Sequence, residues 1–125
     1  MSETALMHEV MKAISAKGHK IFRTNVGKVR MRDGRWFDTG LPKGYSDLCG
    51  TKKGGRAFYI ETKLHPRKPT KEQVQFLLAM IKTGAIGGVA YSVEEALKII
   101  EWDDDYAKMT VHALEGILLC GHSDR

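Results

Sequence analysis

The sequence lacks the features that mark secreted, membrane and zinc-finger proteins. It contains two cysteines, Cys49 and Cys120, which stand far apart and form no CxxC pair. This argues against a disulfide framework, and we expect free thiols in a reducing compartment. No apolar run approaches the length of a membrane span, and the N-terminus carries acids instead of the basic start of a signal peptide. These absences predict a soluble, cytoplasmic protein.

Internal repeats, low-complexity segments and linkers are also missing. The 125 residues therefore fit one domain, which we expect to have a core over about residues 3–100 and a C-terminal extension over 101–125. The formal net charge of +5 favours a polyanionic partner, although many basic proteins bind nothing anionic.

The apolar periodicity predicts an α/β fold in which helices cover a mixed central sheet. Three helices are expected to begin at Ser2, at the Thr70–Gln73 capping box and at the Ser92–Glu95 capping box. Strands are expected over residues 19–24, 46–51, 56–64 and 86–91, with a separate hairpin turning at Asp33-Gly34. The pattern predicts no definite structure for the acidic run and apolar tail that follow Trp102.

The strand around residues 57–64 carries two charged residues on one face. With a period of two, Glu61 and Lys63 project together, while Phe58 and Ile60 face the opposite way. Taken alone, this pattern is more often a solvated face with a weak ion pair than a functional site.

The segment Gly44-Tyr45-Ser46-Asp47 strengthens the functional interpretation. It leads into a short strand that a tight turn joins to the Glu61 strand, so a hairpin can bring Asp47 close to Glu61. Two neighbouring carboxylates repel each other unless a cation lies between them, and their hard oxygen ligands suit Mg²⁺. Lys63 would add positive charge where a charged transition state needs it.

These motifs resemble the VRR-NUC (virus-type replication-repair nuclease) domain of the PD-(D/E)XK nuclease superfamily. The resemblance rests on Gly44-x-Ser-Asp47, Glu61-Thr-Lys63 and Thr70-x-x-Gln73, and it covers roughly residues 3–100. It implies a restriction-endonuclease-like core that uses Mg²⁺, for which Mn²⁺ would substitute. It also implies that Asp47, Glu61 and the Thr62 carbonyl bind the metal, and that Lys63 is the catalytic lysine. Family members often have proline where this chain has Ser46, a difference that removes no ligand.

The resemblance implies two further catalytic residues, and both have a structural alternative. Gln73 would point from its helix toward the metal, or it would bond back to the Thr70 backbone as the last residue of the capping box. Glu3 fits the family's first-helix glutamate better than Glu9, because Leu6 and Met7 align it with the apolar stripe. It could also be a first-turn acid favoured by the helix dipole.

Basic residues flank the predicted site in three clusters suited to the phosphates of DNA. The candidate DNA-binding residues are Lys28, Arg30, Arg32, Arg35, Lys53 and Arg67. For any one of them a solvated surface position is the commoner explanation. Trp36 and Phe37 could stack on bases, although aromatics in sheets are more often buried.

The sequence thus predicts a metal-dependent, structure-selective DNA endonuclease, similar to the standalone viral members of the family that resemble Holliday junction resolvases. A less selective flap or single-strand nuclease and a catalytically silent DNA-binding module remain alternatives. Because a two-fold junction needs two equivalent sites, we expect a homodimer acting on branched DNA. The apolar tail over residues 111–120 would supply the interface or cap the core of the monomer.

Overall fold

The computed structural model describes residues 1–24, 26 and 28–120, and it shows a mixed α/β fold. The described helices are α1 (Glu3–Ala16), α2 (Lys71–Lys82), α3 (Val93–Glu101) and α4 (Asp104–Leu119). The described strands are β1 (Lys20–Arg23), β2 (Lys28–Arg30), β3 (Trp36–Asp38), β4 (Leu48–Thr51), β5 (Ala57–Thr62) and β6 (Ile86–Ala90). None of these helices is long and apolar enough to cross a membrane.

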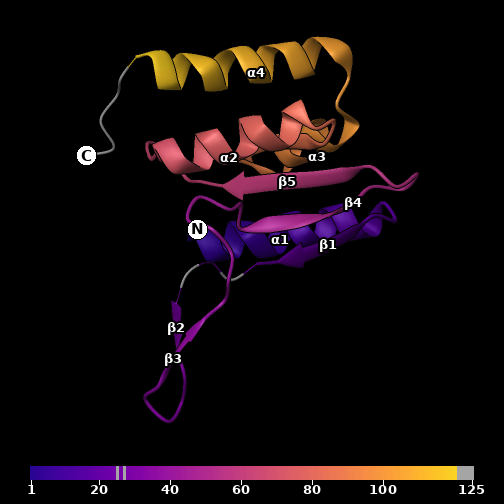
Figure 1. Cartoon of the computed structure of the whole chain (residues 1–125). Coiled ribbons are helices and arrows are strands. Elements are labelled where there is room, and N and C mark those ends of the chain that lie inside the picture. Colours follow the sequence, from indigo (N-terminus) through magenta and orange to yellow (C-terminus); the bar gives the residue numbers. More distant parts are fainter. Residues whose placement is uncertain (25, 27, 121–125) are drawn as a thin grey trace.

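Four of the strands form a mixed central sheet in the order β1-β4-β5-β6. Neighbouring strands are antiparallel except β5 and β6, which are parallel and joined through α2. A parallel pair requires such a crossover, because the chain must return to the same end of the sheet. β2 and β3 form a separate antiparallel hairpin, which projects from the body (Figure 1).

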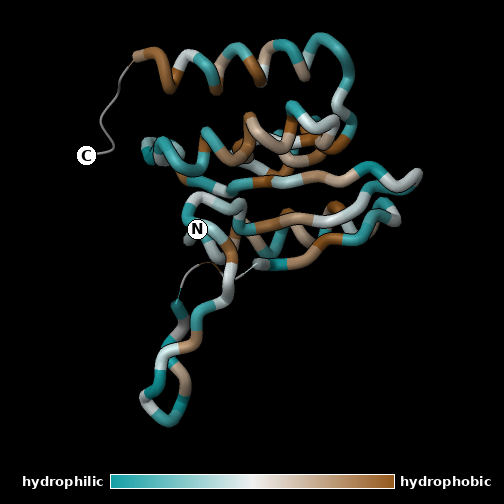
Figure 2. Tube along the Cα trace, in the orientation of Figure 1, coloured by the Kyte–Doolittle hydropathy of each residue, from teal (hydrophilic) through white to brown (hydrophobic). Residues whose placement is uncertain are grey.

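Helices cover both faces of the central sheet. α1 and α3 contact each other and bury one face of β5, where Phe58 and Ile60 are fully buried. α2 covers the opposite face, and α4 lies on the outer side of α2 (Figure 1). In Figure 2 the hairpin is hydrophilic along much of its length, in contrast to the brown segments inside the body. The predicted alternation of faces along β5 is confirmed.

The three predicted N-cap residues act as caps, but only the Thr70–Gln73 pair forms a complete capping box. The box predicted at Ser92–Glu95 is wrong in its second half, because the Glu95 carboxylate accepts from the Tyr91 backbone N–H instead of that of Ser92. Ser2, Thr70 and Ser92 each accept a hydrogen bond from the backbone N–H three residues later, which satisfies a donor that the helix leaves unpaired. The three predicted helices are therefore confirmed. The predicted strands are also present, although each is shorter at one or both ends than the pattern suggested.

The C-terminal extension contains a fourth helix that the sequence analysis did not define. Asp103 caps α4 by accepting a hydrogen bond from the Tyr106 N–H, so the acidic run forms the helix start. Leu114 is only 4% exposed and packs with Val74 and Leu77 of α2. Part of the predicted tail thus caps the core of the monomer. Residues 121–125 of the predicted extension lie outside the described part of the chain.

Candidate active site

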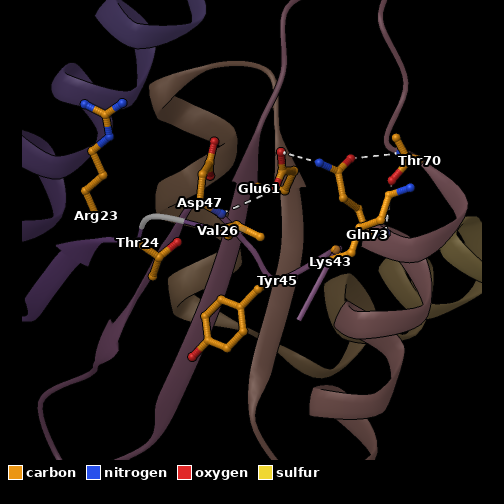
Figure 3. Close-up of a pocket in the computed structure, with 10 residues that line it drawn as sticks. Arg23, Thr24, Val26, Lys43, Tyr45, Asp47, Glu61, Thr70 and Gln73 are labelled. Carbon is orange, nitrogen blue, oxygen red and sulfur yellow. Dashed lines mark hydrogen bonds between the residues drawn. The ribbon is translucent and has the colours of Figure 1, made fainter. Parts of the chain in front are cut away.

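The two predicted carboxylates are neighbours at one end of the sheet. In the β4–β5 register Leu48 pairs with Ile60, which places Asp47 beside Glu61. The Asp47 backbone N–H donates to Glu61 Oε1 at 3.3 Å. Figure 3 shows both carboxylates pointing in the same direction from adjacent strands.

Thr62 fixes the orientation of Asp47. Its hydroxyl donates to Asp47 Oδ2 at 2.8 Å, and its backbone N–H donates to Oδ1 at 3.2 Å. The N–H and C=O of a strand residue point to the same edge, so the Thr62 carbonyl is directed toward the Asp47 side of β5. This direction matches the ligand role that the family resemblance implies.

Burial gives the carboxylates unusual protonation behaviour. Glu61 is 5% exposed, and burial together with the negative charge of Asp47 raises its pKa to about 8. Burial also raises the pKa of Asp47, although the two bonds from Thr62 and the charge of Lys63 oppose that rise. Two acids that resist ionisation at one place are typical of sites that use a bound cation or a shared proton.

Lys63 lies beside this pair and is itself buried. Its Nζ is 3.7 Å from Glu61 Oε2, and the residue is 4% exposed. The solvated-face interpretation of Glu61 and Lys63 is therefore wrong, because both residues are buried. A buried ammonium lowers the cost of the nearby negative charge but does not compensate both acids.

The Gln73 side chain both bonds back to Thr70 and reaches the acidic centre. Its Oε1 accepts a 2.8 Å hydrogen bond from the Thr70 backbone N–H, which completes the capping box. Its Nε2 donates to Glu61 Oε2 at 3.0 Å. Figure 3 shows the side chain bridging the helix start and the carboxylate. The two ends of one amide thus connect the N-terminus of α2 to the acidic centre.

Gly44 allows the Asp47 segment to approach α2. Its φ of +94° lies in the left-handed region, and a Cβ there would lie 2.5 Å from the Glu72 carbonyl oxygen. The next residue, Tyr45, packs against Phe76 of α2 with ring centroids 4.5 Å apart. The Ser46 hydroxyl donates to the Leu48 carbonyl at 2.7 Å and is fully buried. Serine at the position of the family's proline therefore gains a local structural role.

An open pocket of about 450 Å³ adjoins the acidic centre. Asp47, Glu61 and Gln73 line it together with Arg23 and Lys43, two basic residues that the sequence analysis did not select. No motif marks them, because they reach the pocket through the antiparallel pairing of β1 with β4 and through the loop that leads into Gly44.

Glu3 pairs with a predicted DNA-binding residue. Arg67 Nη1 lies 2.8 Å from Glu3 Oε2, and the charge of Glu3 contributes to the raised pKa of Glu61. Glu9 instead faces solvent and pairs with Lys12 at 3.6 Å. The choice of Glu3 over Glu9 as the acid nearer the site agrees with this placement.

The other predicted DNA-binding residues occupy two places. Lys28, Arg30, Arg32 and Arg35 lie on the projecting hairpin, with Arg32 in its turn. Lys53 lies in the β4–β5 turn, at the opposite end of these strands from Asp47 and Glu61. Its neighbours Lys52 and Arg56 donate to the Ile100 and Gly84 carbonyls, so this cluster tethers helix ends. The structure does not bring Lys53 to the site.

The protein side chains at this site supply only part of the oxygen ligands that a hard divalent cation needs. Among residues 1–24, 26 and 28–120, no group of three His, Cys, Asp or Glu side chains could hold a metal. Asp47 and Glu61 supply two anionic oxygen ligands, and the Thr62 carbonyl points to the same side. Mg²⁺ commonly binds through one or two carboxylates and completes its shell with water and substrate phosphate. The residues present fit that pattern.

No protein-family model matches this chain, and no curated protein matches it either.

Proposed function

We propose that the protein is a metal-dependent nuclease that hydrolyses phosphodiester bonds in DNA, with a restriction-endonuclease-like core. The observation that carries this proposal is the buried Asp47–Glu61 pair, in which the pKa of Glu61 is raised to about 8. Two desolvated acids are costly to a fold unless a shared proton or a cation offsets their charge. A cation would also explain why the pair lies beside an open pocket.

Mg²⁺ or Mn²⁺ would be held by Asp47, Glu61 and the Thr62 carbonyl. When bound, it would supply a Lewis acid to the scissile phosphate and to the attacking water. The hydrogen bonds from Thr62 keep the Asp47 carboxylate oriented without the metal. Gln73 does the same for Glu61, so the ligands are preorganised.

Lys63 would stabilise the transition state and position the water. Lys63 directly follows β5, and its ammonium lies 3.7 Å from Glu61 at a point shielded from solvent. A fixed charge in a partly desolvated site stabilises developing phosphate charge more strongly than a mobile surface lysine would.

DNA would reach this centre along a basic surface. Arg23 and Lys43 line the pocket. The segments that line it also lead into and out of the hairpin that carries Lys28, Arg30 and Arg32. Structure selectivity for branched DNA, as in Holliday junction resolvases, would follow from two copies of the site in a homodimer.

The test is a cleavage assay on matched four-way junction, flap, single-stranded and linear duplex DNAs, each with Mg²⁺, Mn²⁺ or EDTA. We expect metal-dependent cleavage with junctions cut fastest. Preferred cutting of flaps or single strands would support the less selective nuclease. Metal-independent binding with no cleavage of any substrate would identify a silent DNA-binding module.

A further inference from the structure

The β2–β3 hairpin exposes two aromatic rings. Trp36 is 63% exposed and Phe37 is 55% exposed, and neither belongs to the two apolar clusters of the described residues. The sequence-based expectation that aromatics in sheets are buried is wrong for both rings. An isolated two-stranded hairpin is only marginally stable in water, and two large exposed rings at adjacent positions on it add no packing that would stabilise it. A binding role is therefore a natural use for them.

The two rings lie on opposite faces of the hairpin, because neighbouring residues of a strand alternate. Trp36 pairs with Arg30, and its indole lies 5.8 Å from the Arg30 guanidinium carbon. This cation–π contact orients the ring at low entropic cost. Phe37 is open to solvent on the other face.

Positive charge accompanies the rings. Arg30, Arg32 and Lys28 are exposed, whereas Arg35 is paired with Asp33 at 2.7 Å. Exposed aromatics interleaved with cations are the pattern of surfaces that bind single-stranded nucleic acid, where bases stack on rings and phosphates meet the charges. A protein partner with an apolar groove would not require these three exposed cations.

The hairpin is also continuous with the pocket of the candidate active site. Thr24 and Val26, which precede β2, line that pocket, as do Lys43 and Tyr45 on the returning segment. A strand held on the hairpin would therefore be led toward Asp47 and Glu61.

We propose that the β2–β3 hairpin is an arm that binds unpaired DNA bases by stacking on Trp36 and Phe37. This inference rests on the proposed function for the choice of DNA as the ligand. It adds that unpaired nucleotides at a branch are the feature that the protein recognises. Fully paired duplex offers no free base faces to the rings and binds through its phosphates alone.

The test measures binding of the full chain in EDTA, without cleavage, to an oligothymidine and to a duplex of equal length. We expect Trp36→Ala to raise the Kd for the oligothymidine at least about fivefold and to leave the duplex Kd nearly unchanged. Met109→Ala is the control, because Met109 is 59% exposed on α4, on the other side of the body from the hairpin (Figure 1). It should bind both DNAs like the wild type.

Tryptophan fluorescence gives a second readout. The chain has two tryptophans, and Trp102 is only 9% exposed, so quenching by oligothymidine should come from Trp36 and vanish in Trp36→Phe while binding persists. Equal Kd values for Trp36→Ala and wild type, or equal losses on both DNAs, would overturn the stacking arm. Tighter binding of an oligouridine would overturn the choice of DNA. A chain that binds as expected but never cleaves with metal would refute the nuclease proposal alone.

Discussion

The side-chain amide of Gln73 donates a 3.0 Å hydrogen bond to the Glu61 carboxylate while it completes the cap of its own helix. This link makes the start of α2 part of the acidic centre. The positive end of the helix dipole then lies close to the charge that needs stabilisation.

The two functions of Gln73 can be separated by a pair of variants. Thr70→Ala removes one capping bond but leaves the Gln73–Glu61 contact, so we expect about 1 kcal/mol less stability and nearly unchanged cleavage. Gln73→Ala removes the contact as well and should lower activity about 10- to 100-fold. Urea unfolding and single-turnover cleavage measure the two effects. If Thr70→Ala lost as much activity as Gln73→Ala, the cap alone would explain the role of Gln73.

Protonation of Glu61 should make metal-free stability depend on pH. Between its ordinary pKa of 4.5 and the raised value of about 8, the folded state retains a proton that the unfolded state has lost. Folding is therefore most favoured at the acidic end of this window, and the free energy of unfolding should fall as pH rises through it. Denaturant titrations in EDTA across this range provide the measurement.

Asp47→Asn is the matched variant for this pH dependence. The amide can keep both contacts with Thr62, but it removes the negative charge that helps raise the pKa of Glu61. The fall in stability should then be smaller, whereas Glu9→Gln, which changes an exposed acid, should behave like the wild type. Identical pH profiles for wild type and Asp47→Asn would show that the two acids are not coupled.

Divalent metal should stabilise the wild-type chain by binding the folded state alone. We expect Mg²⁺ or Mn²⁺ to raise the Tm at pH 8, with no rise for Asp47→Asn and a normal rise for Glu9→Gln. Lys63→Ala should keep the metal-induced rise but lose most turnover, since its proposed role is in the transition state. Loss of the metal response in Lys63→Ala would instead make this lysine a structural part of the metal site.

The hairpin arginines should govern the salt dependence of DNA binding. Arg30→Gln with Arg32→Gln should weaken binding to any sequence and reduce the salt slope by about two. The control pair, Lys82→Gln with Lys108→Gln, neutralises exposed lysines on α2 and α4. Binding isotherms across salt concentrations compare the two pairs. If the dependence of the binding constant on salt were the same for both pairs and the wild type, these arginines would not contact DNA.

A homodimer would combine two acidic centres for paired cutting of a junction. Leu119, which is 86% exposed at the end of α4, remains available for an interface, whereas Leu114 is committed to the core of the monomer. Light scattering at micromolar concentration should give twice the chain mass. Mixtures of wild-type and Glu61→Gln chains should then leave junctions cut on one strand; a monomeric mass with undiminished paired cutting would refute the dimer.

Local signals in the sequence predicted much of the fold. Helix caps such as Ser2 and Thr70 depend only on residues a few positions away, and so does the period-two pattern around Glu61. Such features can therefore be predicted from the sequence alone. The sequence analysis assigned no structure to the segment of α4, although Asp103 is its N-cap and acids are favoured in a first helical turn.

Tertiary contacts explain what the site prediction missed. Asp47 and Glu61 were expected to meet because one short hairpin joins them. The pairing of Arg67 with Glu3 and the approach of Lys43 to the pocket depend on packing between segments far apart in the chain. The burial of Lys63 likewise follows from tertiary packing, which the period-two pattern of the strand does not define.

Cleavage of a four-way junction by matched variants tests the central claim most directly. Wild type, Glu61→Gln, Asp47→Asn and the surface control Glu9→Gln would be compared at equal concentration with Mg²⁺, after thermal unfolding confirms that each is folded. We expect the wild type and Glu9→Gln to cleave at the same rate and both site variants to lose cleavage while still binding the junction. Full cleavage by Glu61→Gln or Asp47→Asn would contradict the proposed active centre.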